Sequence, residues 1–119
     1  MIYGSHVVIY STDAPSDRAV FRDVLGWRSV DAGGGWLIFA LPPAEAAIHP
    51  AESSSTGLFL MSDDLAADIA LLAANGIRCS EVEDARWGTV TRFTLPGGAE
   101  VGLYQPTHDS PLSAPGVRG

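Results

Sequence analysis

The sequence predicts an α+β fold of two tandem βαβββ modules, whose mixed sheets cup a cleft and whose helices cover the outer faces. The first observation is a repeat, because the turn and short strand at residues 95–106 echo those at residues 41–50. The second is a pair of helix-like runs, which begin at Asp13 and Asp63 and end at Gly26 and Gly76, a constant offset of 50. The third is strand-like alternation around both runs. All three observations follow if one motif occurs twice.

Module one covers about residues 4–50. Asp13 offers a capping oxygen ahead of Pro15, and apolar side chains then recur at helical spacing as far as Gly26. β-branched and aromatic residues predict the strands, and the glycines before Trp36 suit a hairpin turn. The predicted strands are 6–10, 27–30, 36–41 and 44–49.

Module two covers about residues 57–106 and follows a polar, serine-rich link at 50–56. Asp63 or Asp64 can cap its helix, and the predicted strands are 58–62, 77–82, 88–95 and 99–104. The two modules together are expected to form one domain, residues 1–106. Residues 107–119, rich in proline, serine and glycine, are predicted to be a flexible tail.

Alternation along the strands separates two sets of side chains. One set is aliphatic and is expected to pack under the helices: Val7, Ile9, Ala46, Ile48, Leu58, Leu60, Val101 and Leu103. The other set mixes polar and aromatic groups, among them His6, His49, Phe59 and Tyr104. Aromatic walls with a few convergent polar groups are typical of a small-molecule cleft, so we place the binding face there. Alternation does not settle the faces of Trp36 and Trp87, which are further candidates for the lining.

Composition limits the partners. Seven Lys and Arg against fourteen Asp and Glu give a net charge of −7, which repels nucleic acid and anionic membrane surfaces. The single cysteine, Cys79, excludes an intrachain disulfide, and its surroundings in the sequence indicate a structural residue. No apolar run is long enough to span a membrane, and the N-terminus lacks the features of a signal peptide. We expect a cytoplasmic protein.

Several features together resemble the vicinal oxygen chelate superfamily, the group of glyoxalases, bleomycin-resistance proteins and extradiol dioxygenases. They are the two βαβββ modules, a His seven residues before Asp13, the run FRDVLGW, and the terminal LPGGAEVGLYQP. The resemblance covers residues 4–106. It implies metal ligands on the first and last strands of each module, positions that hold His6, His49, Gly57 and Gly102 in this chain.

Gly102 stands where the family's motif has an acidic metal ligand, so the resemblance departs at this position. Glu100, two residues earlier on the same face, is the candidate to complete a set with His6 and His49, or to move a proton as a catalytic base. Gly57 and Gly102 are expected to enlarge the cleft, because they leave one wall without side chains. His108 is expected to be solvent-exposed in the tail.

Two functions remain open. The first is a small-molecule binding protein without a cofactor or a tightly bound metal, which holds an aromatic or amphipathic ligand against His6, His49, Phe59, Tyr104, Gly102, Trp36 and Trp87. The alternative is a glyoxalase-like lyase or isomerase, thiol transferase or dioxygenase, which uses a divalent metal (Zn, Ni, Mn or Fe) held by His6 and His49. Because family members pair modules within or between chains, the resemblance also implies a homodimer.

Overall fold

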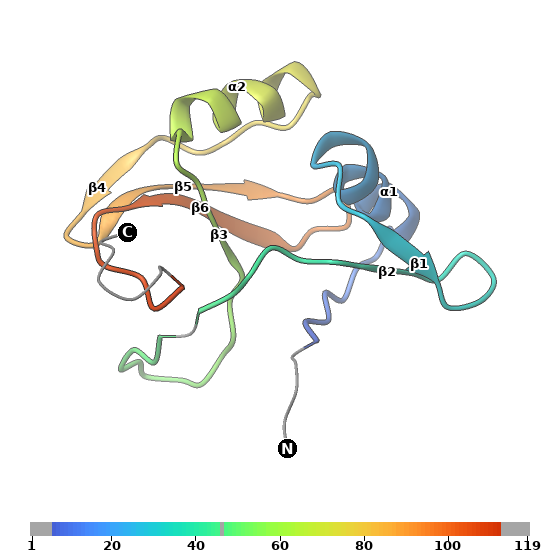
Figure 1. Ribbon diagram of the computed structural model, residues 1–119, viewed down its shortest axis with the longest axis horizontal. Coiled ribbons are helices and arrows are strands. Elements are labelled where there is room, and N and C mark those ends of the chain that lie inside the picture. The colour runs from blue at the N-terminus through green and yellow to red at the C-terminus, as the bar shows by residue number, and fades with distance from the viewer. Residues whose placement is uncertain (1–5, 46, 113–119) are drawn as a thin grey trace.

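A four-stranded mixed sheet lies at the centre of the computed structural model, which describes residues 6–45 and 47–112 (Figure 1). Its strands lie in the order β3 (Phe59–Met61), β6 (Glu100–Pro106), β5 (Gly88–Thr94) and β4 (Glu83–Ala85). β3 runs parallel to β6, whereas β6, β5 and β4 are antiparallel neighbours. With α2 (Leu65–Ala74) between β3 and β4, the second half of the chain has the predicted βαβββ order.

The strand predicted at 77–82 is wrong in its bounds, because these residues form no regular strand. Cys79 makes an isolated bridge with Phe93, and the regular pairing of β4 begins only at Glu83. The hydroxyl groups of Ser80 and Thr91 explain the local shape, because Thr91 donates to the Ser80 carbonyl oxygen at 2.6 Å and Ser80 Oγ accepts from Arg92 N–H at 3.0 Å. Side chains here replace part of the backbone ladder.

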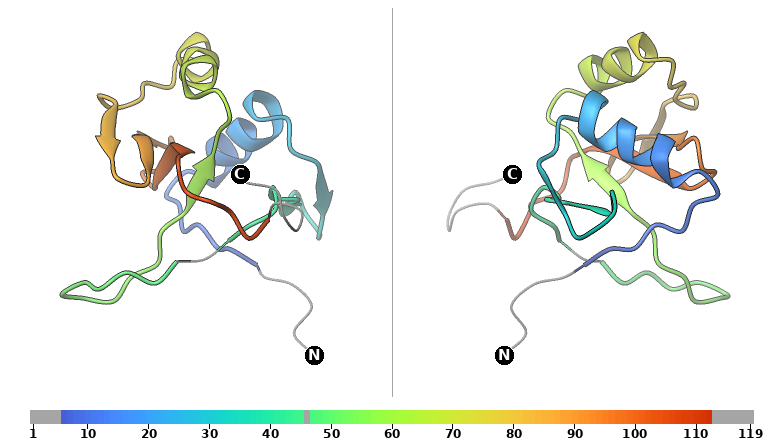
Figure 2. Two further views of the ribbon diagram at one scale, coloured as in Figure 1. Left: turned by 60° about the vertical axis from the view of Figure 1, so that its left-hand side comes forward. Right: turned by 90° about the vertical axis from the view of Figure 1, so that its right-hand side faces the viewer.

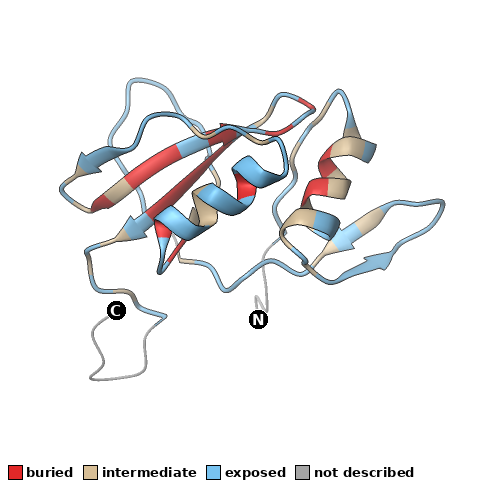
Figure 3. Cartoon of the chain, turned by 90° about the horizontal axis from the view of Figure 1, so that it is seen from above, coloured by how far each residue is buried: buried red, intermediate tan, exposed pale blue. Residues whose placement is uncertain are grey.

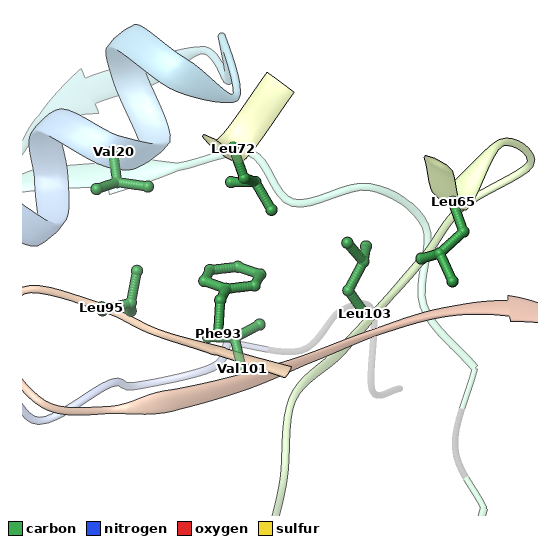
Figure 4. Close-up of a cluster of buried hydrophobic side chains, with 7 residues drawn as sticks. All are labelled: Val20, Leu65, Leu72, Phe93, Leu95, Val101 and Leu103. Carbon is green, nitrogen blue, oxygen red and sulfur yellow. The ribbon is translucent and has the colours of Figure 1, made fainter. Parts of the chain in front are cut away.

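Helices from both halves cover one face of this sheet (Figures 1 and 2). They are α2 and a continuous helical segment formed by α1 (Ala14–Ala19) and the π-helical η1 (Val20–Val24). The core between the helices and the sheet is aliphatic apart from one ring (Figure 4) and consists of Val20, Leu65, Leu72, Phe93, Leu95, Val101 and Leu103. No helix in the described ranges is both long and apolar enough to cross a membrane.

The two helices begin with the same hydrogen bonds, as the repeat predicts. Ser11 Oγ accepts from Asp13 N–H and Ser62 Oγ accepts from Asp64 N–H, at 2.9 and 3.0 Å. Each of these Asp residues is the N-cap, and its carboxylate accepts from the backbone N–H three residues on. The second helix is thus capped by Asp64 rather than Asp63. In both helices the cap accepts a hydrogen bond from a backbone N–H of the first turn that has no partner within the helix.

The repeat is not a constant offset of 50, because the caps are 51 positions apart whereas the terminal glycines, Gly26 and Gly76, are 50 apart. The first helix therefore holds one residue more than the second. That residue is taken up by η1, where Leu25 N–H donates to the Val20 carbonyl oxygen five residues back. A π-helical turn is the usual way to insert one residue into a helix without moving its ends.

A clip joins the first helix to the turn between β5 and β6. Gly97 N–H donates to Asp17 Oδ1 at 2.6 Å, and Thr12 Oγ1 donates to the Gly97 carbonyl oxygen at 3.1 Å. A Cβ atom at Gly97 would overlap Ser11 Oγ, so this close approach requires glycine. The clip holds the helix of the first half against the sheet of the second.

In the first half, the described residues 6–45 and 47–50 pair only as a two-stranded hairpin of β1 (Ser29–Asp31) and β2 (Leu37–Phe39). The predicted turn is confirmed, since the Asp31 carboxylate accepts from Gly33 N–H and Gly35 N–H. The strands predicted at 6–10 and 44–49 are wrong for the described residues, which are coil there; Ala46 lies outside them. β-propensity favours an extended chain but cannot provide a neighbouring backbone to pair with.

Burial divides the residues predicted to face the helices into two groups, one buried or packed against the core and one exposed (Figure 3). Val101 and Leu103 are buried, and Leu58, Leu60 and Ile9 pack against the core, as predicted. Val7 and Ile48 are exposed, Ile48 to 94%, so their assignment to the core is wrong. Both lie in segments that pair with no strand among the described residues.

Candidate ligand-binding face

The candidate site lies on the face of the four-stranded sheet that turns away from the helices. Phe93, Val101 and Leu103 face the core, so their strand neighbours Arg92, Gly102 and Tyr104 point to the opposite side. The register places Gly102 between Phe59 of β3 and Arg92 of β5. This row, with Tyr104 two residues along β6, forms the floor of the face.

Three aromatic rings pack together on this floor. The ring centroids of Trp87 and Tyr104 are 5.0 Å apart, and Phe59 lies 6.1 Å from Tyr104 and 6.2 Å from Trp87. All three pairs meet edge to face, at interplanar angles between 79° and 87°, which is the arrangement favoured by the quadrupoles of the rings. Three of the predicted lining residues therefore meet, although they come from three separate segments. We call Phe59, Trp87 and Tyr104 the aromatic cluster.

Gly102 does not enlarge a cleft, contrary to the prediction. A Cβ atom at this position would overlap the Phe59 ring, so the ring occupies the space above the glycine. Gly57 also lies beside Phe59, whose Cε1 would be 3.7 Å from a Cβ added there. At the family's acidic ligand position the chain therefore has a glycine covered by an aromatic ring.

Glu45 and two residues of the C-terminal segment form a polar edge beside the aromatic cluster. Tyr104 Oη donates to Glu45 Oε1 at 3.3 Å, and Ser110 Oγ donates to Glu45 Oε2 at 2.6 Å. His108 Nε2 lies 3.1 Å from Tyr104 Oη and 3.6 Å from Glu45 Oε1. Burial raises the pKa of Tyr104, and the charge of Glu45 and the hydrogen bond to it raise it further. The Tyr104 phenol is thus held in its neutral, donating form.

Arg92 covers the other side of the cluster. Its guanidinium carbon lies 5.0 Å from the centroid of the Phe59 ring, within the range of a cation–π interaction. The same side chain reaches Glu100, with 3.9 Å between Arg92 Nη1 and Glu100 Oε1. Glu100, the candidate base, is therefore an exposed carboxylate that faces an arginine.

The aromatic cluster does not include the other predicted lining side chains. His6 and His49 are exposed on coil segments. Trp36 is 66% exposed just before the second hairpin strand, where Arg18 lies 5.5 Å from its ring. Of two shallow hollows, one of about 370 Å³ lies beside α2, and the other, of about 470 Å³, lies beside Cys79 and is lined in part by Arg92 and Glu100.

The ligand set implied by the resemblance does not fit a metal ion in this arrangement. The two histidines lie on separate exposed coils, Glu100 faces Arg92, and Phe59 covers Gly102. Within residues 6–45 and 47–112, no three His, Cys, Asp or Glu side chains are grouped so that they could hold an ion. The donors present would give at most isolated ligands, whereas a stable site needs three or four.

Three residues of the site carried little or no signal in the sequence. One is Glu45, whose side chain is only 16% exposed. Another is His108, which was expected in solvent but packs on Tyr104 with 5.9 Å between ring centroids. The third is Arg92. Alternation along the strands indicated this face through Phe59 and Tyr104, but it cannot show that Glu45 and His108 reach the face from other segments.

The fold can now be compared with solved structures. The antibiotic-binding protein TnmS3 from Streptomyces sp. CB03234 has a TM-score of 0.63 and 25% identity, over 90% of this chain and 100% of that one. A glyoxalase/bleomycin resistance protein from the same strain has a TM-score of 0.59 and 25% identity, over 82% of this chain and 95% of that one. Lactoylglutathione lyase from Agrobacterium tumefaciens has a TM-score of 0.63 at 16% identity, over 87% and 92% of the two chains.

No protein-family model matches the chain, and neither does any curated protein. The structural similarity nevertheless confirms the resemblance seen in the sequence. The chain has the fold of the vicinal oxygen chelate superfamily, and its structural neighbours are glyoxalase/bleomycin resistance and antibiotic-binding proteins.

Proposed function

We propose that the protein binds an aromatic small molecule on the open face of the four-stranded sheet, without a tightly bound metal. The observation that carries this proposal is the aromatic cluster, in which Phe59 covers the position of the family's acidic metal ligand. A flat ligand can stack on such rings and gain both apolar burial and edge-to-face contacts. The likeness to TnmS3, an antibiotic-binding protein, supports the same class of function.

The test measures the binding of a panel of polycyclic aromatic compounds. Calorimetry gives the affinity, and the NMR signal of the Trp87 indole N–H reports contact with the aromatic cluster. Trp87→Leu should weaken binding by roughly tenfold or more, because stacking on an aromatic wall is lost. Trp36→Leu is the matched control, since Trp36 lies on the hairpin away from the cluster and should leave affinity unchanged. Equal losses in the two variants would contradict the proposed site.

The metal-dependent enzyme is the alternative, and the observation that favours it is the placement of His6 and His49 at family ligand positions in the sequence. Titration of Zn, Ni, Mn and Fe(II) into untagged protein distinguishes the two functions. We expect no binding tighter than micromolar. Submicromolar binding that both His6→Ala and His49→Ala abolish would replace the binding function with the enzyme, and its loss in Glu100→Gln would identify the third ligand.

We also infer that two copies associate. Large apolar side chains of the first half are exposed, among them Tyr10 at 89%, and they lie in segments with strand-like sequence and no partner strand. A second copy that pairs with these segments would supply the missing backbone partners and bury the side chains. Light scattering should give the mass of a dimer, and a monomer mass across micromolar concentrations would contradict this inference.

A cytoplasmic setting remains a prediction, which the free thiol of Cys79 favours.

A further inference from the structure

Glu45 is an unusual neighbour for an aromatic cluster, because its carboxylate is largely removed from solvent. Its side chain is 16% exposed, and among the described residues it contacts two hydroxyl groups and the His108 imidazole, without a Lys or Arg. Hydroxyl groups satisfy the lone pairs of a carboxylate but do not neutralise its charge. Within residues 6–45 and 47–112, the aromatic cluster therefore has a negative charge at one edge that no Lys or Arg side chain pairs with.

His108 shows what kind of group this edge accepts. Its imidazole is a flat nitrogen heterocycle, tilted 34° to the Tyr104 ring, with Nε2 within reach of both Tyr104 Oη and Glu45 Oε1. Nδ1 lies 2.7 Å from the Asp109 carbonyl oxygen and must carry a proton, since a carbonyl oxygen can only accept. When Nε2 is also protonated, the ring presents a cation to Glu45 and a donor to Tyr104.

The segment that carries His108 is held beside the aromatic cluster by hydrogen bonds at both ends. Thr107 donates its N–H to the Trp87 carbonyl oxygen at 3.0 Å and its Oγ1 hydroxyl to the Arg86 carbonyl oxygen at 3.2 Å, and Ser110 donates to Glu45. Between them, His108 makes its polar contacts with Tyr104 and Glu45. A ligand group that binds Glu45 and Tyr104 would therefore compete with the His108 imidazole for the same two partners.

We propose that Glu45 and Tyr104 form a subsite for a positively charged nitrogen on an aromatic ligand, and that His108 occupies this subsite when the ligand is absent. The inference rests on the proposed function and adds the charge of the ligand to it. A protonated amine would donate to the carboxylate in a charge-assisted hydrogen bond while its ring system stacks on the aromatic cluster. An anionic ligand would meet the Glu45 charge and be excluded.

The first test compares three naphthalene probes of the same shape: 1-naphthylmethylamine, 1-naphthalenemethanol and 1-naphthoate, which are cationic, neutral and anionic at pH 7. Calorimetry with the full chain should show the amine bound about tenfold or more tightly than the alcohol, and the carboxylate most weakly. Glu45→Gln should remove the preference for the amine. Glu83→Gln, on exposed β4, is the matched control for net charge and should keep it.

The second test addresses His108 and predicts the opposite sign. His108→Ala should bind the amine several-fold more tightly, because the ligand no longer competes with the imidazole. His6→Ala should not change the affinity, since His6 lies on an exposed coil. In the unmodified protein, addition of the amine should move the imidazole NMR signals of His108 and leave those of His6 unchanged.

The outcomes separate the inference from the proposed function. Equal affinities for amine and alcohol, with no effect of Glu45→Gln, would overturn the charged subsite and leave an aromatic site in place. Weaker amine binding by His108→Ala would show that His108 contacts the bound ligand, rather than occupying the subsite only when the ligand is absent. Failure of all three probes to bind would overturn the proposed function together with this inference.

Discussion

The two halves of the chain begin alike and end differently. Residues 11–26 and 62–76 share the Ser and Asp caps, the helix and the glycine that follows it. After that glycine, the second half completes a four-stranded sheet, whereas the part of the first half that the structure describes forms only the β1–β2 hairpin. The comparison teaches that a short local signal can be duplicated faithfully while the sheet, which depends on partners far away in sequence, is not.

A difference in one turn gives a physical reason why the sheet of the second half is not repeated in the first. In the second half, Gly98 adopts a φ of +101° and donates its N–H to the Leu95 carbonyl oxygen at 2.8 Å, which turns the chain from β5 into β6. After the matching Leu41 and Pro42, the first half has Pro43 and Ala44 where the second half has Gly97 and Gly98. Pro43 has no N–H to match the bond that Gly97 donates to Asp17, and an alanine is strained at the positive φ of Gly98, so the same turn does not form. The last strand of the first half is therefore not directed back onto its neighbour.

The largest difference in unfolding free energy is expected between a leucine of the buried core and an exposed isoleucine of the first half. Leu103→Ala should cost on the order of 2 to 5 kcal/mol of unfolding free energy, because a buried leucine is removed from a packed core. Ile48→Ala should cost less than about 0.5 kcal/mol, since that side chain is exposed. Urea titration measures both. A comparable loss from Ile48→Ala would show that the first half is covered in solution, as a dimer would require.

The second-largest difference between the halves is expected at the turn between β5 and β6 and at its counterpart in the first half. Gly98→Pro should cost about 2 to 4 kcal/mol, through loss of the hydrogen bond and of the positive φ. Pro43→Gly in the first half should cost less than about 1 kcal/mol, chiefly through greater freedom of the unfolded chain. Thermal unfolding of the two variants would contradict the explanation if Pro43→Gly were as damaging as Gly98→Pro.

Gly102 and Gly57 offer a third, smaller contrast. Gly102→Ala should cost about 1 to 3 kcal/mol, because the added methyl group overlaps the Phe59 ring and must push it aside. Gly57→Ala meets the same ring at 3.7 Å, an ordinary contact, and should be close to neutral. A double-mutant cycle of Gly102→Ala with Phe59→Ala should recover part of the loss. Additive costs would mean that the ring does not lie over Gly102.

The smallest effect concerns ionisation within the aromatic cluster. In a variant with Tyr3→Phe and Tyr10→Phe, absorbance near 295 nm follows Tyr104 alone, and its midpoint should lie above the ordinary value of 10.0. Because the pKa is raised in the folded state, the associated stability is complete below the unfolded pKa and is lost as pH rises through the folded one. Glu45→Gln should lower the midpoint, whereas Glu83→Gln should not. An unchanged midpoint in Glu45→Gln would place that carboxylate away from the phenol.

The sequence by itself determined the features that depend on neighbours a few residues apart. It predicted a cap at Asp13 and another at Asp63 or Asp64, the glycine-rich turn after Asp31, and the buried alternation of Val101 and Leu103. These are consequences of backbone geometry and of period-two or helical spacing, which a local pattern carries in full. The superfamily fold followed from the order of such elements along the chain.

Only the tertiary structure decided which extended segments found a partner strand and which side chains met on the open face. Phe59 covers Gly102 because β3 and β6 pair in parallel at one register, and no local signal fixes the register between strands about forty residues apart. His108 was expected in solvent, yet it meets Glu45 at Tyr104. Their chemistry depends on burial and on each other's distance, and both quantities exist only once the chain has folded.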